Sequence, residues 1–131
     1  EHRVHLQEEL GMIRERLLNL YLQAGLAPPT VKEALGQFPS RQRDTEAVLA
    51  ILLRENSLVK INEDLYYHHE VLDRFQEDYR RLLLRDGKAT PASFKELTGL
   101  SRKFIIPLME YFDFVKLTVR SGDHRILRER R

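Results

Sequence analysis

The sequence of 131 residues has 42% hydrophobic and 32% charged side chains, which is typical of a folded globular protein and not of a disordered chain. It contains no cysteine, which excludes disulfide bonds and cysteine-based zinc sites. No apolar run approaches the roughly 18 residues of a membrane-spanning helix, and no signal peptide is recognisable, so we expect no membrane partner and a cytoplasmic location. Because the sequence begins with Glu1 rather than Met, we expect a piece of a longer protein.

The net charge of +2 is unevenly distributed along the chain. Residues 1–69 carry a net charge of −2, whereas residues 70–131 carry +4, and residues 87–131 alone carry +5. A basic excess at one end is typical of a protein that binds a polyanion. A solvated surface of lysine and arginine would give the same charge, so charge alone leaves both interpretations open.

The first half of the sequence predicts three helices followed by a β-hairpin. Thr30 and Glu33 form a capping-box pattern at the start of a short second helix, and Thr45 is placed to cap a third. Residues 58–68 have the pattern of strand, turn and strand. The first helix, which Gly25 ends, has apolar residues at spacings of three and four, and we expect them on its buried face: Leu6, Leu10, Ile13, Leu17 and Leu20.

The second half repeats this order of elements. Ser93 begins a second capping-box pattern, although Thr90, which is followed by proline, is an alternative start for the same helix. Ser101 is placed to cap the third helix, after which residues 115–120 alternate as a half-buried strand should and residues 121–123 form a turn. Apolar residues mark the buried faces of the first and third helices: Leu72, Phe75, Tyr79 and Leu82, then Phe104, Ile105, Leu108, Met109 and Phe112.

The two halves together form an internal repeat. The segment 31–36 recurs 63 positions later at 94–99, with similar residues at most positions. Three helices followed by a hairpin is the plan of a winged helix, in which a helix-turn-helix carries a β-ribbon wing. We therefore predict a mainly α (α+β) fold of two tandem winged-helix modules, residues 1–69 and 70–131, with no flexible linker between them.

The second module resembles a known family over residues 94–127. The family pattern is close to F-R-x-L-x-G-T-S-R-K-x-A-x-P-L-L-E-Y-x-D, followed by T-x-R-x-G-D-x-R. It belongs to the last winged-helix module of the bacterial selenocysteine-specific translation elongation factors (SelB), and the first module resembles the preceding module of that family only in plan. Leu100, Ile106 and Met109 depart conservatively from the pattern. The residues that match it are Ser101, Arg102, Lys103, Pro107, Leu108, Glu110, Tyr111, Asp113, Thr118, Arg120, Gly122, Asp123 and Arg125.

This resemblance implies an RNA-binding function. In that family the modules bind the hairpin in selenoprotein mRNA that recodes a UGA stop codon, and the GTPase domains and the selenocysteinyl-tRNA pocket lie upstream. Contacts with the ribosome and that tRNA would therefore be made by the full-length protein, and we expect a monomer. The sequence contains no Gly-x4-Gly-Lys-Ser/Thr phosphate-binding run, so we expect neither GTP hydrolysis nor a cofactor in this piece.

We predict RNA contacts at the start of the third helix of the second module and at its wing. Free amides and the helix dipole at a helix start favour a phosphate, and arginine both binds phosphates in a bidentate manner and stacks on bases. Arg120 and Arg125 are expected to be exposed, with cross-strand pairing to Asp123 or Glu129 as the alternative. The predicted RNA-binding residues are Ser101, Arg102, Lys103, Arg120, Gly122, His124, Arg125 and Arg128, with Arg130 and Arg131 extending the basic edge.

Two other functions remain open: a protein–protein interaction scaffold and duplex-DNA binding. A DNA reader usually points Arg, Asn or Gln at bases from the third helix, whose exposed middle here carries Ile106, Glu110 and Asp113. The acidic turn at residues 62–64 would repel phosphate, so the first module is predicted to be a spacer or docking module. His68 and His69 lack the usual spacing of metal ligands on a helix, and no constellation of catalytic residues is recognisable, so neither a metal site nor catalysis is expected.

Overall fold

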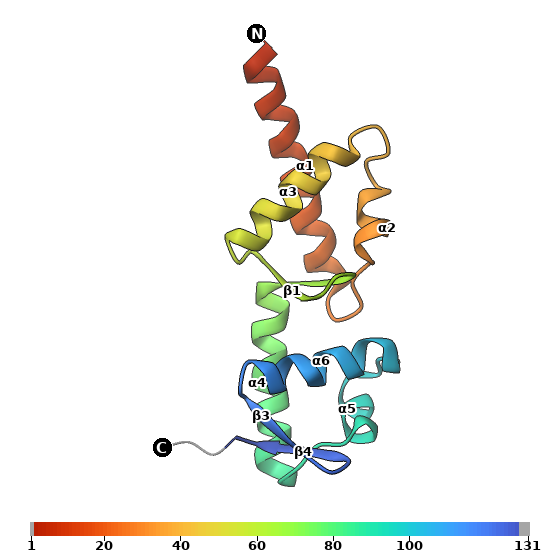
Figure 1. The fold of residues 1–131 in the computed structure, drawn as a ribbon, viewed down its shortest axis with the longest axis vertical. Coiled ribbons are helices and arrows are strands. Elements are labelled where there is room, and N and C mark those ends of the chain that lie inside the picture. The colour runs from red at the N-terminus through yellow and green to blue at the C-terminus, as the bar shows by residue number, and fades with distance from the viewer. Residues whose placement is uncertain (1, 129–131) are drawn as a thin grey trace. The chain divides into compact units, whose positions relative to one another are not determined.

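The computed structural model describes residues 2–128 and divides into two compact units, Glu1–Leu72 and Asp73–Arg131. The division lies three residues after the boundary predicted from the sequence. Helix α4 (His69–Asp86) begins directly after strand β2 (Leu65–His68), so the chain passes from the first unit to the second within one helix (Figure 1). None of the helices in residues 2–128 combines the length and the apolar character that a membrane span requires.

The first unit has the predicted order of three helices and a hairpin. It consists of α1 (His2–Ala24), α2 (Val31–Leu35) and α3 (Gln42–Arg54), followed by β1 (Leu58–Asn62) paired antiparallel with β2. Thr30 caps α2 as predicted, because its hydroxyl accepts the Glu33 amide while the Glu33 carboxylate accepts the Thr30 amide.

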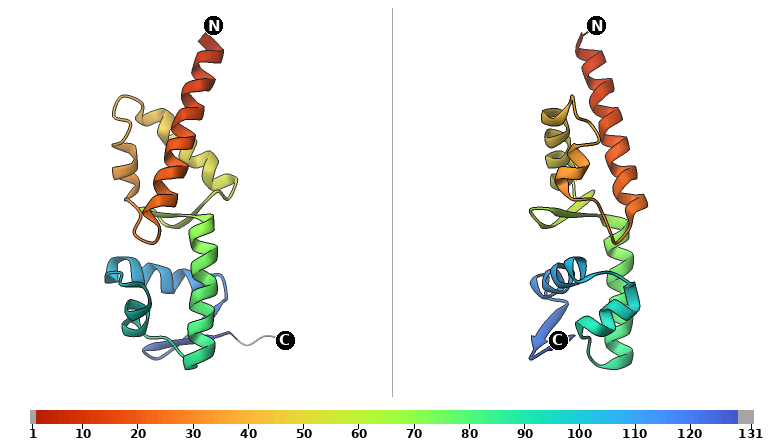
Figure 2. Two further views of the ribbon diagram at one scale, coloured as in Figure 1. Left: turned by 180° about the vertical axis from the view of Figure 1, so that it is seen from behind. Right: turned by 90° about the vertical axis from the view of Figure 1, so that its right-hand side faces the viewer.

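The core of the first unit forms where α1 packs against α3. Burial on α1 begins at Ile13, so the prediction that Leu6 is buried is wrong: Leu6 is 38% exposed. The first turns of α1 extend past α2 and α3, as both rotated views also show (Figure 2). The core residues are Ile13, Leu17, Tyr21, Ala34, Phe38, Val48, Leu49, Leu52 and Leu58.

Helix α3 begins four residues earlier than the sequence pattern suggested, so the prediction that Thr45 caps it is wrong. Arg41 is the residue before the helix, and its guanidinium donates to Asp44 in the first turn and to Glu9 on α1. Thr45 is buried inside the helix, where its hydroxyl donates to the Arg41 carbonyl at 2.8 Å. The ion pair between Arg41 and Asp44 therefore stabilises the first turn of α3 in place of the expected threonine cap.

The second unit repeats the plan with α5 (Pro91–Thr98), α6 (Arg102–Phe114), β3 (Thr118–Ser121) and β4 (His124–Leu127) after α4. Thr90 and Ser93 form a reciprocal capping box with Pro91 in the first turn, so the alternative start of this helix is confirmed and Ser93 is not its cap. Gly99 then closes α5 in the left-handed conformation, at φ 72°.

The third helices of both units end in the same way, and in the second unit this ending moves the start of the wing to a later residue than predicted. Lys116 adopts φ 70° and the Leu117 amide donates to the Phe112 carbonyl; in the first unit Asn56 adopts φ 65° and the Ser57 amide donates to the Leu52 carbonyl. Residues 115–117 therefore close the helix, and the strand predicted to begin at 115 begins at 118. The shared ending supports the internal repeat.

The core of the second unit is an aromatic cluster. Phe75, Tyr79, Phe94 and Phe112 are all at most 4% exposed. The ring centroids of Phe75 and Tyr79 lie 5.0–6.0 Å from each other and from those of Phe94 and Phe112. Among the side chains that the structure describes, the buried hydroxyl of Tyr79 has no hydrogen-bond partner. A buried hydroxyl without a partner destabilises the folded state because it loses its bond to water.

We therefore expect Tyr79→Phe to raise the free energy of unfolding by about 1 kcal/mol, or the melting temperature by roughly 4–8 °C. Tyr67→Phe is the matched control, since the Tyr67 hydroxyl donates to the Leu26 carbonyl at 2.9 Å and its loss should destabilise the protein by a similar amount. Thermal unfolding of both variants measures whether Tyr79→Phe raises the melting temperature and Tyr67→Phe lowers it. A clear loss of stability in Tyr79→Phe would show that its hydroxyl has a partner.

Candidate nucleic-acid interface

The start of α6 presents exposed polar groups that can receive a phosphate. Ser101 precedes the helix in an extended conformation, and its hydroxyl makes no capping hydrogen bond. Ser101, Arg102 and Lys103 are all exposed, and within residues 3–128 neither cation has a carboxylate partner. The Lys103 ammonium lies 5.1 Å from the centre of the Phe104 ring, which leaves it at the surface. The uncapped amides, the helix dipole and two unpaired cations together favour an anion here.

The turn of the second wing presents a third exposed cation. Gly122 forms the turn at φ 66°, and the Arg120 guanidinium donates to the Gly122 carbonyl at 3.1 Å while remaining exposed. His124 is half-buried, and its ring nitrogen lies 3.2 Å from the carboxylate of Asp123, whose pKa this contact lowers. In Figure 1 the start of α6 and this turn lie on the same side of the second unit.

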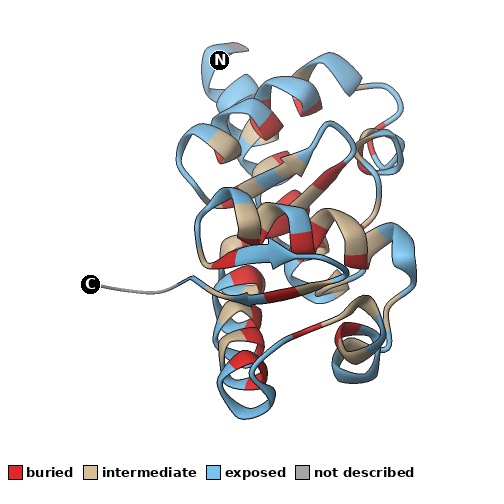
Figure 3. Cartoon of the chain, turned by 60° about the horizontal axis from the view of Figure 1, so that its bottom comes forward, coloured by how far each residue is buried: buried red, intermediate tan, exposed pale blue. Residues whose placement is uncertain are grey.

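Arg125 is buried, so the prediction that its side chain is exposed is wrong. Its side chain is 7% exposed, and its guanidinium binds the Asp113 carboxylate at 2.9 and 3.1 Å. The Thr118 hydroxyl donates to the same carboxylate at 2.6 Å. Arg125 and Ala89 also exchange backbone hydrogen bonds at 2.8 and 2.9 Å, so β4 is bonded on both edges, whereas β3 is mostly exposed (Figure 3). Arg125 therefore fixes the wing to α6 and to the segment between α4 and α5, and its side chain does not face solvent.

Arg128 lies at the base of the wing, away from the turn. Its amide donates to the Leu117 carbonyl at 2.9 Å, and its exposed side chain borders a cavity with Lys116. In Figure 1 this end of the wing lies on the opposite side of the unit from the β3–β4 turn. Arg130 and Arg131 lie outside the described residues. The continuous basic edge predicted from the sequence is thus divided into two separate surfaces.

The corresponding surface of the first unit differs in charge. Lys60 on β1 forms an ion pair with Glu63 at 2.9 Å, and this contact raises the pKa of Lys60. The turn contains Asp64 as well, whose carbonyl accepts the Val31 amide. The wing of the first unit therefore presents acidic groups and a neutralised lysine, which suits a phosphate poorly.

Three possible metal ligands come together at the end of the first hairpin. The ligand atoms of His68, His69 and Glu70 all lie within 4.8 Å of one another. His68 is buried and its Nδ1 accepts the Glu70 amide at 3.1 Å. Since that nitrogen is already used within the protein, the hydrogen bond accounts for the position of His68 without an ion, and the absence of a metal site stays a prediction.

The environment of His68 makes the stability of the protein depend on pH. Burial lowers the pKa of His68, and repulsion from His69 lowers it further. The unfolded chain then binds a proton near pH 6.5 that the folded chain resists, so stability should fall as the pH drops below about 6.5. Melting curves between about pH 7.5 and about pH 5.5 should show a smaller loss for His68→Asn than for the wild type or for His5→Asn at an exposed position. The Oδ1 of asparagine takes the place of the His68 Nδ1 and can still accept the Glu70 amide. Equal losses in all three proteins would contradict this.

Comparison with known proteins places the chain in a family. The family model "Elongation factor SelB, winged helix" matches residues 81–127. A selenocysteine-specific elongation factor from Desulfomicrobium baculatum is 35% identical over 129 residues, which is 98% of this chain and 20% of that protein. The chain belongs to the winged-helix region of the SelB family. The selenocysteine-specific elongation factor of Escherichia coli K12 is 25% identical over the same share of both chains, so the chain spans about a fifth of the length of these curated SelB relatives.

A solved SelB structure matches almost the whole fold. It is the mRNA-binding domain of elongation factor SelB from E. coli in complex with SECIS RNA, with a TM-score of 0.79 and 25% sequence identity over 93% of this chain and 98% of that one. The fold of two winged-helix modules is thereby confirmed.

Sequence reasoning missed the buried network around Asp113. Asp113 and Thr118 both match the SelB pattern, yet Asp113 was placed on an exposed helix face. The signal that identifies the network is strand alternation: Thr118 and Arg125 face the core from β3 and β4, and Asp113 is the acid at the end of the helix directly before them.

Proposed function

We propose that this chain is the RNA-binding part of a selenocysteine-specific elongation factor and that it recognises the hairpin in selenoprotein mRNA that directs UGA recoding. The observation that carries the proposal is the match, over nearly the full length of both chains, to a SelB domain whose structure contains SECIS RNA. The unpaired cations at the start of α6 and at the wing turn supply a surface of the right charge.

The geometry suggests how the second unit would hold an RNA stem. Proteins recognise A-form stems mainly through phosphates and sugars and read sequence from unstacked loop bases. Arg102, Lys103 and the amides at the start of α6 would bind phosphates. Arg120, which lies on the wing, would bind the other RNA strand of the stem or a base of the RNA loop. Arg125 would act as a positioning residue, because its ion pair with Asp113 fixes the wing relative to α6.

The other features of the chain fit a supporting role within a larger protein. The first unit would be a spacer or docking module, since its wing is acidic and Lys60 is ion-paired. Contacts with the ribosome and selenocysteinyl-tRNA, together with GTP hydrolysis, would belong to other parts of the full-length protein, which would act in the cytoplasm. The chain itself would act as a monomer without a cofactor.

The test is a titration of the whole chain with a selenoprotein-mRNA hairpin, an unrelated hairpin and duplex DNA at one salt concentration, followed by fluorescence anisotropy. The proposal predicts the tightest binding to the selenoprotein-mRNA hairpin. Equal affinity for all three would show a general polyanion-binding surface, and preference for duplex DNA would favour the alternative function.

The affinity for the hairpin should also fall steeply with salt. Each phosphate that a lysine or arginine neutralises releases counterions, so the slope of log K against log salt concentration should be about −2 or steeper. The same titration between low and moderate salt measures it. A flat response would indicate that apolar contacts dominate, as with a protein partner.

A further inference from the structure

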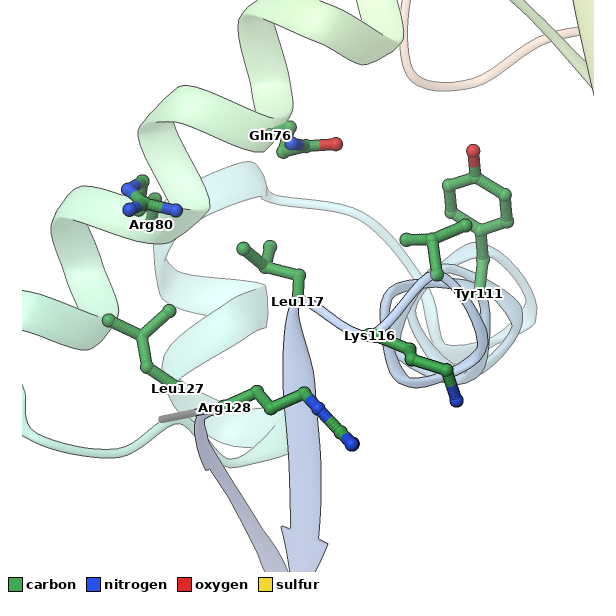
Figure 4. A pocket seen from close by; sticks show the side chains of 8 residues that line it. Gln76, Arg80, Tyr111, Lys116, Leu117, Leu127 and Arg128 are labelled. Atoms are coloured by element: carbon green, nitrogen blue, oxygen red, sulfur yellow. The ribbon is translucent and has the colours of Figure 1, made fainter. Parts of the chain in front are cut away.

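A cavity of about 300 Å³ lies at the base of the second wing, between α4, the end of α6 and the wing (Figure 4). Gln76 and Arg80 approach it from α4, Tyr111 and Lys116 lie on the other side, and Leu117 lies between them (Figure 4). Leu127 adds a second apolar side chain. The cavity therefore has apolar and polar walls and reaches the size at which pockets begin to bind small ligands.

Three cations border this cavity, and their charge is not neutralised nearby. Within residues 3–128, none of Arg80, Lys116 and Arg128 forms an ion pair, and no carboxylate lines the cavity. Burial raises the pKa of Tyr111 and the negative charge of Asp73 raises it further, but Asp73 is not part of the lining. The cavity thus combines a concentrated positive charge with the neutral hydrogen-bonding groups of Gln76 and Tyr111. This combination suits an anionic ligand that also carries hydrogen-bonding groups.

An exposed aromatic ring lies next to this surface in the chain. Phe114 at the end of α6 is 80% exposed, and Val115 directly after it lines the cavity. Aromatic rings on which bases stack, beside cations that hold the backbone, are typical of surfaces that bind single-stranded nucleic acid.

We propose that this cavity binds a nucleotide of unpaired RNA, with the base against Leu117 and Leu127 and the phosphate between Lys116 and Arg128. It would be a second RNA site, because the base of the wing lies on the opposite side of the unit from the α6 start and the wing turn (Figure 1). This second site rests on the proposed function, because its ligand is taken to be RNA. The nucleotide comes either from the strand flanking the bound hairpin or from a separate RNA.

The test uses the whole chain and a labelled oligouridylate, measured by fluorescence anisotropy. Arg80→Gln and Arg128→Gln should each weaken binding by roughly tenfold, the size expected for a lost phosphate contact. Lys116→Asn should do the same, and asparagine is chosen because it tolerates the φ of 70° at this position. Circular dichroism of each variant confirms that it folds. Arg102→Ala is the matched control and should leave oligouridylate binding unchanged while weakening hairpin binding.

Two further arms identify the source of the nucleotide. Oligouridylate is added to protein saturated with hairpin, and separately the hairpin is given a single-stranded extension. Undiminished binding of the free oligonucleotide indicates a separate RNA, whereas a gain in hairpin affinity from the extension that the cavity variants abolish indicates the flanking strand. Both outcomes support the site.

The proposal is overturned if the three cavity variants bind oligouridylate like the wild type, if Arg102→Ala weakens that binding equally, or if an oligoglutamate peptide competes as well as RNA does. These results differ from a failure of the proposed function, which would be seen as a lack of preference for the selenoprotein-mRNA hairpin.

Discussion

Replacing Arg125 with alanine is expected to lower the free energy of unfolding by about 3 kcal/mol, because it leaves the Asp113 carboxylate without its buried partner. This value is at the lower end of the range for a broken buried pair, since 26% of the Asp113 side chain is exposed. The substitution also removes the guanidinium that holds β4 to α6. A unit of this size has only marginal stability alone, so the wing should lose its fixed position. Chemical denaturation of the whole chain measures the loss.

Arg120→Ala is the matched control for this prediction. Arg120 lies directly opposite Arg125 in the hairpin, but its side chain is exposed, so its removal should change stability by no more than about 0.5 kcal/mol. If Arg125→Ala unfolds like the wild type and still loses RNA binding, Arg125 contacts RNA directly and its positioning role is wrong.

The combined variant Arg102→Ala, Lys103→Ala and Arg120→Ala should almost abolish hairpin binding. Each charge-assisted contact with a phosphate or base contributes about 1–3 kcal/mol, so the three together should weaken binding by roughly a hundredfold or more. The melting temperature should change little, because all three side chains are exposed and none is ion-paired within residues 3–128. Anisotropy titrations and thermal unfolding of the same preparations separate the two effects.

An equal number of cations in the first unit provides the control for this variant. Lys32→Ala, Arg54→Ala and Lys60→Ala together remove the same charge from exposed positions and should leave hairpin affinity nearly unchanged. If this set weakens binding as much as the first set, both units bind the RNA and the spacer role of the first unit is wrong. If Arg102→Ala by itself unfolds the second unit, Arg102 stabilises the fold, and its assignment as an RNA-binding residue at the start of α6 is wrong.

The order of elements was predictable from the sequence because periodicity and turn residues act locally. Leu72, Phe75, Tyr79 and Leu82 lie on the buried face of α4, as their spacing predicted, and Gly99 and Gly122 adopt the left-handed conformations that glycine favours. The family was identified from the resemblance over residues 94–127. The spacing of apolar residues predicts helices and strands but does not identify a family.

The errors arose where tertiary contacts decide the outcome. Arg125 looks like a surface cation in the sequence, but the Ala89 bridge places β4 between two neighbours, and Asp113 then makes burial of its charge favourable. Thr45 was a suitable cap, but Arg41 extended α3 by binding Asp44 and Glu9. The cavity at Lys116 joins residues up to 52 positions apart, from Gln76 to Arg128, which no local pattern indicates.

The central claim is that the second unit holds the RNA hairpin through the start of α6 and the wing turn. Mapping backbone amide chemical shifts of the whole chain during titration with a selenoprotein-mRNA hairpin tests it most directly. We predict the largest changes at residues 101–103 and 120–124, with small changes throughout residues 3–68. Changes concentrated at the β1–β2 turn or along α3 of the first unit, with residues 101–103 unaffected, would contradict the claim.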